Sequence, residues 1–214
     1  MSERRQANRS GQAVLLVRGG QPIAFVRVRR GLDPETDPEV KSLRLLRESR
    51  PRTFRIPEVL AAGRVKDWGY VALSALPVAL HRPPRRPALE AIIEEIQTGL
   101  EALPRPDGTP RLWVPMHGDL TPWNLRRLPD GDLVLLDWER AGWGPPGADQ
   151  LLYQASEVAF GWRSVRPSSN LEAVRFWQGR IAGRSATDRD RALSLNLARA
   201  LEGMVVGAGA ARAD

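Results

Sequence analysis

The sequence predicts an α+β fold in two lobes, a small antiparallel sheet followed by a mainly helical part. Up to residue 77, β-rich runs bounded by turn residues dominate, with one amphipathic helical segment between them. Beyond residue 88, apolar residues recur at helical spacing, interrupted by one short hairpin pattern. With 214 residues and 42% hydrophobic content, the chain is long enough to bury a sizeable core.

The first lobe is predicted to hold four strands and one helix. Gly19 and Gly20 separate the first two runs, which is typical of a β-hairpin. Pro38 stands at the expected start of a helix over residues 39–48, after a turn rich in Asp and Pro. The strands are predicted at residues 13–18, 22–29, 57–65 and 69–76.

The second lobe is predicted to begin after a proline-rich connector at residues 81–87. A helix is expected over residues 88–103, a hairpin with arms 124–128 and 132–136, and helical structure from about residue 148 onward. We therefore expect a flexible tail at residues 1–12, an N-lobe at 13–77 and a C-lobe at 78–214.

The composition excludes several kinds of site. The chain has no cysteine, which excludes disulfides, cysteinyl zinc sites and thiol nucleophiles. His81 and His117 are the only histidines, so a histidine-rich metal cluster is excluded as well. A metal would have to bind oxygen ligands, which favours magnesium.

The net charge of +7 raises the possibility of a nucleic-acid-binding module. However, 30 of the 32 basic residues are arginine and they are spread along the whole chain, so we consider nucleic acid an unlikely partner. The longest nearly apolar run, residues 69–80, is too short to span a bilayer. The first dozen residues lack the apolar stretch of a secretory signal, so we expect no membrane partner and a cytoplasmic protein.

The segment with the strongest chemical signal is HGDLTPWN at residues 117–124, followed after the hairpin by LLDWE at 135–139. Phosphoryl transfer from ATP needs a carboxylate that orients the attacking hydroxyl and accepts its proton. It also needs an amide oxygen and a second carboxylate that hold Mg²⁺ against the phosphates. Asp119, Asn124 and Asp137 have the residue types and the spacing for these three tasks, since the hairpin turns Asp137 back toward Asn124.

These motifs resemble the catalytic core of the aminoglycoside phosphotransferase and choline kinase family, which has a protein-kinase-like fold. The resemblance is strong over residues 115–151 and weaker but colinear over 13–77. It implies that Asp119 is the catalytic base, that Asn124 and Asp137 are magnesium ligands, and that ATP (less readily GTP) is the phosphate donor. It also implies supporting roles for His117 and Asp149.

Two departures from this family pattern concern the N-lobe. Kinases hold the α- and β-phosphates with a strand lysine paired to a glutamate on the next helix, whereas this chain has arginine there. Arg27 with Glu39 is the predicted pair, although Arg29 has the same strand parity and stays an alternative. Few residues precede residue 13, so we expect the first strand and the phosphate-covering loop to be missing or rebuilt.

The leading functional hypothesis is a phosphotransferase that acts on a hydroxyl of a small molecule. Residues 141–214 contain nine arginines and seven acidic residues, so a neutral or anionic acceptor is favoured over a polycation. A catalytically weak or inactive pseudokinase is the first alternative, and the basic nucleic-acid-binding module is the second.

Overall fold

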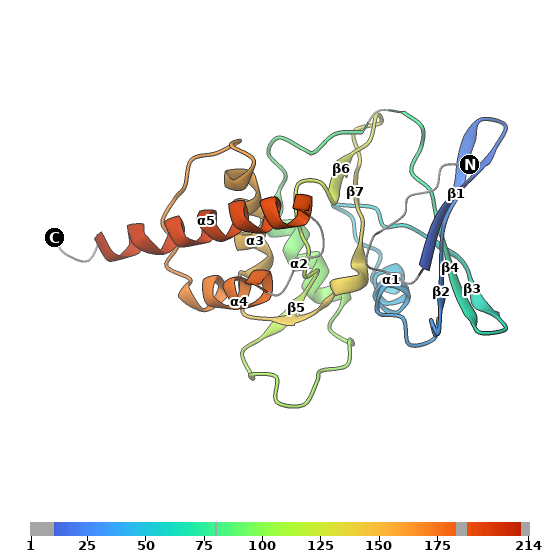
Figure 1. The fold of residues 1–214 in the computed structure, drawn as a ribbon, viewed down its shortest axis with the longest axis horizontal. Helices are drawn as coiled ribbons and strands as arrows, with labels where there is room; N and C mark the ends of the chain where they lie inside the picture. The colour runs from blue at the N-terminus through green and yellow to red at the C-terminus, as the bar shows by residue number, and fades with distance from the viewer. Residues whose placement is uncertain (1–10, 80, 183–187, 211–214) are drawn as a thin grey trace.

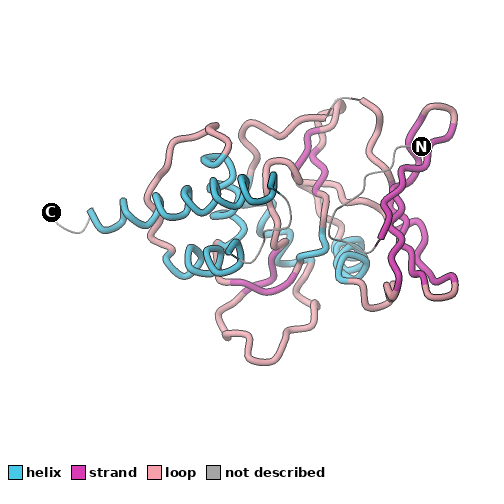
Figure 2. The backbone as a smooth tube through the Cα atoms, viewed as in Figure 1, coloured by secondary structure: helices cyan, strands magenta, loops and turns pink. Residues whose placement is uncertain are grey.

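The computed structural model describes residues 11–79, 81–182 and 188–210. Figure 1 shows a sheet at one end of the molecule and a group of helices at the other, with α1, α2 and a small hairpin between them. Figure 2 shows the same division by secondary structure, strands gathering at the sheet end and helices at the opposite end. The predicted α+β class, a small antiparallel sheet and a mainly helical part, is confirmed.

The sheet has four antiparallel strands in the order β1-β2-β4-β3. Their bounds are β1 Gly11–Arg18, β2 Gln21–Arg30, β3 Val59–Val65 and β4 Trp68–Ser74. β2 pairs with β1 on one side and β4 on the other, so Arg27 lies on a central strand. The predicted hairpin turn at Gly19 and Gly20 is confirmed, and both glycines have positive φ, which suits a tight turn.

Helix α1 (Pro38–Ser49) follows β2 and packs between the sheet and the rest of the molecule. Asp37 caps its N-terminus by accepting hydrogen bonds from the backbone N–H groups of Glu39 and Val40, both at 3.1 Å. Pro38 occupies the first helical position, where its missing N–H costs nothing. The cap and the proline therefore fix where the helix begins and hence where Glu39 lies.

The central elements connect the sheet to the helical end. They are α2 Leu89–Gly99, β5 Val114–Met116, β6 Leu125–Arg127, β7 Leu133–Leu135, the 3-10 helix η1 Trp138–Arg140 and β8 Gly142–Gly144. β6 and β7 form the predicted hairpin, while β5 pairs with β8 across at least 25 intervening residues. The segment from 117 to 124 lies between β5 and β6, so both of its ends are held by strands.

The helical end consists of α3 Ala148–Ala159, α4 Leu171–Ala182 and α5 Asp188–Ala210. Two clusters of buried apolar side chains form the core. The first joins the sheet, α1 and α2 to the central hairpin, and the second joins α3, α4 and α5. No helix in the described ranges is both long enough and apolar enough to cross a membrane.

The structure corrects the element predictions in three places. Residues 160–170, predicted as helical, form a connecting segment between α3 and α4. The pairing of β5 with β8 and the short helix η1 were not predicted. β1 begins at Gly11, so Gly11 and Gln12 belong to the sheet and not to the predicted tail, whose residues 1–10 lie outside the described ranges.

Candidate active site

One buried carboxylate at the start of α3 holds the 117–124 loop by hydrogen bonds to its backbone. Asp149 accepts a hydrogen bond from the backbone N–H of His117 at 2.7 Å and another from that of Gly118 at 3.1 Å. Burial raises the pKa of Asp149 to about 6, against the effect of these two donors. Asp149 therefore holds the two backbone N–H groups directly before Asp119, which agrees with the supporting role predicted for it.

His117 supports the same loop as a neutral side chain. Its Nδ1 accepts the backbone N–H of Asp119 at 3.1 Å, so Nδ1 carries no proton and Nε2 donates to the carbonyl of Leu136 at 3.0 Å. Complete burial lowers the pKa of His117 to about 3. The ring lies 4.4 Å from that of the buried Trp138, so it is also packed in place.

Gly118 allows this loop to pass close to another segment. Its φ is +75°, a conformation that side-chain-bearing residues rarely adopt. A Cβ at this position would overlap the carbonyl oxygen of Arg140. The glycine of the HGD motif is thus required by both the dihedral angle and the space.

Asn124 lies beside Asp119, as the spacing predicts. Its Nδ2 donates to the backbone carbonyl of Asp119 at 2.9 Å and approaches the Asp119 carboxylate Oδ2 at 3.3 Å. The amide nitrogen is therefore directed at Asp119, which leaves the amide oxygen Oδ1 as the atom able to bind a cation. Asn124 is buried, so its orientation is defined by these contacts.

The hairpin brings Asp137 to the same place. The backbone N–H of Leu136 donates to the carbonyl of Asn124 at 3.0 Å, which joins the two segments directly before Asp137. Asp137 has φ 65° and ψ 63°, a left-handed conformation uncommon for a residue with a side chain. Such strained positions cluster at functional sites.

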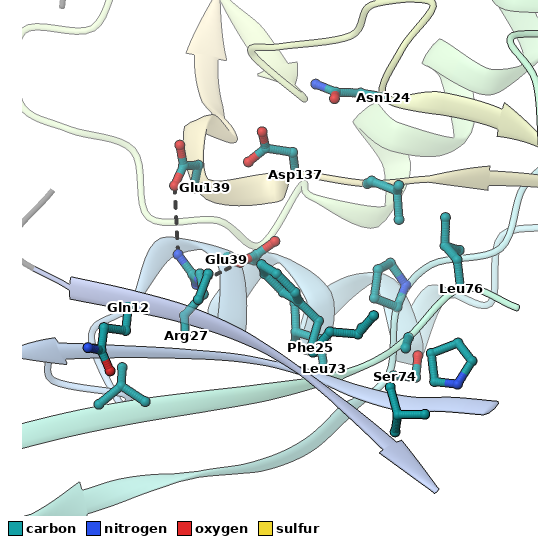
Figure 3. A pocket seen from close by; sticks show the side chains of 18 of the residues that line it. Gln12, Phe25, Arg27, Glu39, Leu73, Ser74, Leu76, Asn124, Asp137 and Glu139 are labelled. Atoms are coloured by element: carbon teal, nitrogen blue, oxygen red, sulfur yellow. Dashed lines mark ion pairs between the residues drawn. The ribbon is translucent and has the colours of Figure 1, made fainter. Parts of the chain in front are cut away.

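Asn124 and Asp137 line one wall of a cleft of about 730 Å³ between the sheet and the central hairpin. Figure 3 shows both side chains facing Arg27 and Glu39 across it, with Phe25, Leu73 and Leu76 providing an apolar part of the wall. This volume lies in the range of clefts that bind a small molecule or a nucleotide. Four of the predicted site residues therefore line this cleft: Arg27, Glu39, Asn124 and Asp137. A fifth, Asp119, contacts Asn124.

Arg27 is held by three carboxylates. Its Nη2 lies 2.6 Å from Glu39 Oε2 and its Nη1 lies 3.7 Å from Glu139 Oε2, as Figure 3 shows by dashed lines. Nη2 also lies 3.3 Å from Asp37 Oδ1. Arg29, the alternative, also lines the cleft, but its side chain is exposed. The predicted pairing of Arg27 with Glu39 is therefore present as an ion pair.

Glu39 is buried and links the two sides of the cleft. Burial raises the pKa of this carboxyl group, and the charge of Arg27 opposes the effect. Its Oε1 accepts the backbone N–H of Trp138 at 3.4 Å. Through Glu39, helix α1 is connected to both β2 and the segment that carries Asp137.

The oxygen groups at this place fit a magnesium ion better than zinc. Among the described residues, no three His, Cys, Asp or Glu side chains are arranged as a metal cage. Mg²⁺ usually takes only one or two protein oxygens and completes its shell with phosphate and water. The amide oxygen of Asn124 and the carboxylate of Asp137 on one wall match that requirement.

Three residues near the cleft were not assigned a role from the sequence. Glu139 belongs to the DWE triplet but its contact with Arg27 could not be inferred from spacing. Asp37 was read as part of a turn and its role as the N-cap of α1 was not predicted, although Asp before Pro is an N-cap signal. His81 in the connector lines the cleft and accepts a hydrogen bond from Arg126 Nε at 3.0 Å, a contact without any local sequence signal.

Comparison with known proteins gives one family match. The sequence model described as APH, phosphotransferase enzyme family, matches residues 78–193, more than half of the chain. No curated protein matches the chain in sequence.

Solved structures show the same fold at low identity. A thermostable mutant of aminoglycoside phosphotransferase APH(4)-Ia, in ternary complex with AMP-PNP and hygromycin B, is 12% identical with a TM-score of 0.55, over 100% of this chain and 94% of the other. Spectinomycin phosphotransferase APH(9)-Ia, in complex with ADP and spectinomycin, is 12% identical with a TM-score of 0.54, over 94% and 79%.

A putative fructosamine-3-kinase from Haemophilus somnus 129PT is 11% identical with a TM-score of 0.53, over 95% of this chain and 90% of the other. Together these structures confirm the predicted two-lobed, protein-kinase-like fold.

Proposed function

Because the chain belongs to the phosphotransferase enzyme family, we propose that it transfers the γ-phosphate of ATP to a hydroxyl group of a small molecule. The observation that carries this proposal is that Asn124 and Asp137 line the 730 Å³ cleft while the amide of Asn124 contacts Asp119. These are the three oxygen groups that phosphoryl transfer requires, held by two segments that are hydrogen-bonded together.

In the proposed reaction, Asp119 orients the acceptor hydroxyl and takes its proton. The acceptor oxygen forms a bond to the γ-phosphorus while the bond from that phosphorus to the β,γ-bridging oxygen breaks, and ADP leaves. His117 and Asp149 keep the Asp119 backbone fixed, so the carboxylate does not have to be reorganised during the reaction.

Asn124 Oδ1 and Asp137 are the groups that would hold Mg²⁺, which supplies charge neutralisation on the phosphates when bound. The bonds from Asn124 Nδ2 to Asp119 support this assignment, because they direct the amide oxygen away from the base. Replacing either residue by alanine is expected to weaken nucleotide binding with magnesium more than without it.

We assign the nucleotide side to an N-lobe of residues 13–77 and the catalytic loop and acceptor side to a C-lobe of 78–214. Arg27 faces the cleft across from Asp137 and is proposed to approach the phosphates while Glu39 holds it. The arginine excess of the helical end supports a neutral or anionic acceptor over a polycationic one.

A nucleotide-binding pseudokinase is the second candidate, and one observation favours it. Three carboxylates already surround the Arg27 guanidinium and balance its charge, which weakens its attraction for the phosphates of a nucleotide. Both candidates predict nucleotide binding, and turnover separates them.

The test combines binding and turnover on one preparation. Thermal denaturation with AMP-PNP, with and without Mg²⁺, is expected to show stabilisation that requires the metal. ADP release is then measured against a panel of hydroxylated compounds.

Asp119→Ala is expected to lower turnover by about 10²- to 10⁴-fold, the usual contribution of a positioned base, while nucleotide binding stays near normal. Near-normal turnover of the variant would remove Asp119 from the mechanism. Stabilisation by nucleotide without ADP release on any acceptor would favour the pseudokinase.

A further inference from the structure

Three aromatic side chains, one of them from the 117–124 loop, form a continuous row of ring contacts that is partly exposed. The ring of Trp123 lies 5.0 Å from that of Phe160, which in turn lies 5.6 Å from that of Trp162. Phe160 is 47% exposed and Trp162 is 53% exposed, so large apolar faces remain in contact with water. We call Trp123, Phe160 and Trp162 the aromatic shelf.

The shelf includes a residue of the loop that carries the proposed catalytic base, Asp119. Trp123 precedes Asn124, whose amide nitrogen contacts Asp119 at 3.3 Å from its carboxylate. Trp123 is thus on the same short segment as the base and one residue from a side chain that contacts it. Phe160 and Trp162 come from the end of α3 and the segment after it, on the helical side (Figure 1). The cleft residues Arg27 and Glu39 belong to β2 and α1, whereas Phe160 and Trp162 lie at and after the end of α3.

A pair of charged groups borders the shelf. The backbone N–H of Trp162 donates to the carbonyl of Glu157 at 2.9 Å, and the Glu157 side chain pairs with Arg163 Nε at 3.0 Å. Glu157 is buried, whereas the Arg163 side chain is 49% exposed and still has donors facing solvent. An apolar face beside a guanidinium and a carboxylate can bind a ligand that is apolar on one side and hydroxylated at its edge.

On this basis, we propose that the aromatic shelf is the acceptor subsite and that it stacks against the face of an uncharged sugar ring. The axial C–H groups of such a ring form an apolar face that packs on an aromatic ring, while its peripheral hydroxyls reach polar neighbours. This proposal rests on the proposed function, since it identifies the molecule that presents its hydroxyl to Asp119.

The shelf geometry and charge argue against two other acceptors. Neighbouring rings are tilted by 59° and 40° and touch one another, so they leave no parallel slot for a nucleobase. A cation could bind over the negative faces of the rings. However, residues 160–170 contain Arg163 and Arg166 and no acidic residue, and the carboxylate of Glu157 is already paired. A cationic acceptor would therefore meet a local positive excess.

The test observes the shelf directly by ¹⁹F NMR of the full chain labelled with 5-fluorotryptophan, with signals assigned by single Trp→Phe replacements. The probes are four neutral methyl glycosides (glucoside, galactoside, mannoside and N-acetylglucosaminide), uridine, choline and kanamycin. At least one glycoside is expected to shift the Trp123 and Trp162 signals and leave that of Trp68, a 45% exposed tryptophan on β4, unchanged.

Matched variants measure the effect on binding. Phe160→Ala combined with Trp162→Ala is expected to weaken glycoside binding at least about tenfold, the equivalent of about 1.4 kcal/mol, and to raise KM for that glycoside. Trp68→Ala removes a ring of similar exposure far from the loop and is expected to change neither quantity. Binding of Mg·AMP-PNP is expected to be the same in both variants.

The experiment distinguishes failure of the proposed function from failure of the shelf proposal. If Mg·AMP-PNP does not bind, the proposed function fails whatever the glycosides do. If the nucleotide binds but only choline, kanamycin or uridine shifts the shelf signals, or no probe does, the shelf proposal fails alone. A dimer that dissociates on Trp162→Ala would show that the shelf is an interface between two copies, which also overturns the proposal.

Discussion

Gly118 shows how a single residue determines the conformation of the candidate catalytic loop. It has positive φ and no room for a Cβ, because the carbonyl of Arg140 lies where that atom would be. We expect Gly118→Ala to reduce the free energy of unfolding by about 2 kcal/mol or more, since both strain and overlap must be relieved. Urea denaturation measures this change.

Gly131 is the matched control for that substitution. It also has positive φ, at +95°, but no atom lies within 4 Å of the position of an added Cβ. Gly131→Ala is therefore expected to cost only the dihedral strain, about 1 kcal/mol. Equal losses for the two variants would mean that contact with Arg140 is unimportant.

His117 and Asp149 give the molecule opposing pH dependences. Between its folded pKa of about 3 and its unfolded pKa of about 6.5, His117 binds a proton only in the unfolded chain, so its contribution to stability is lost as pH falls. The pKa of Asp149 is about 6 in the folded chain and about 3.9 in the unfolded chain. Between these values only the folded chain holds the proton, so the contribution of Asp149 to stability is lost as pH rises toward 6. Between pH 4 and 6 the two effects offset one another.

His117→Gln separates the two effects. The glutamine amide can still donate to the carbonyl of Leu136 but cannot titrate. From pH 6 down to pH 4, the free energy of unfolding of the variant is expected to rise relative to the natural chain. One proton corresponds to a slope of up to about 1.4 kcal/mol per pH unit. Urea denaturation at intervals of one pH unit tests this, and parallel curves would contradict the assignment of a neutral, buried histidine.

Arg27 determines how β2, α1 and η1 are positioned relative to one another. Its guanidinium contacts Glu39 on α1 and approaches Glu139 in η1, while Glu39 also accepts the N–H of Trp138. We expect Arg27→Ala to lower the free energy of unfolding by about 2 kcal/mol, because it leaves the buried Glu39 without its cation. It is also expected to weaken Mg·AMP-PNP binding, as measured by calorimetry.

Arg29→Ala provides the control for Arg27→Ala, because Arg29 is two residues away on the same strand and exposed. Its free energy of unfolding is expected to change by no more than about 0.5 kcal/mol, with nucleotide binding unaffected. A larger loss of nucleotide affinity for Arg29→Ala than for Arg27→Ala would show that the wrong arginine was assigned to the phosphate side.

The elements predicted best are those with strong local signals. The Gly19-Gly20 turn and Pro38 marked the first hairpin and the start of α1, and the HGD loop with its following hairpin was evident from spacing. The β5–β8 pairing was missed because it joins distant short segments with no periodicity of their own. Residues 160–170 were assigned to helix, although Gly161 and Pro167 interrupt the pattern there.

The candidate site was predictable to the extent that its residues belong to one motif. Asp119, Asn124 and Asp137 follow from the spacing of a loop and a hairpin. The contact of Glu139 with Arg27 and the contact of Trp123 with Phe160 in the aromatic shelf depend on which segments tertiary packing brings together. Such contacts join residues that are far apart in the chain, so local sequence patterns do not predict them.

At the scale of the whole molecule, α3 connects the two buried clusters. Leu152 and Tyr153 are neighbours on this helix, yet Leu152 belongs to the cluster with α4 and α5 and Tyr153 to the cluster with the sheet, α1 and α2. Asp149, also on α3, holds the candidate catalytic loop. We therefore expect the sheet end and the helical end to unfold together.

Leu152→Ala tests this coupling, because Leu152 is fully buried and contributes only to the second cluster. The free energy of unfolding is expected to fall by about 3 kcal/mol, the usual cost of a cavity at a buried leucine. If the clusters are coupled through α3, hydrogen exchange in urea will show that α1 and α5 lose protection in one transition, which is shifted to a lower urea concentration by the same amount for both helices.

Leu195→Ala is the control, because Leu195 is 52% exposed on α5. Its free energy of unfolding is expected to stay within about 0.5 kcal/mol of that of the natural chain. Earlier loss of protection in α5 than in α1 would show that the helical end unfolds as a separate unit.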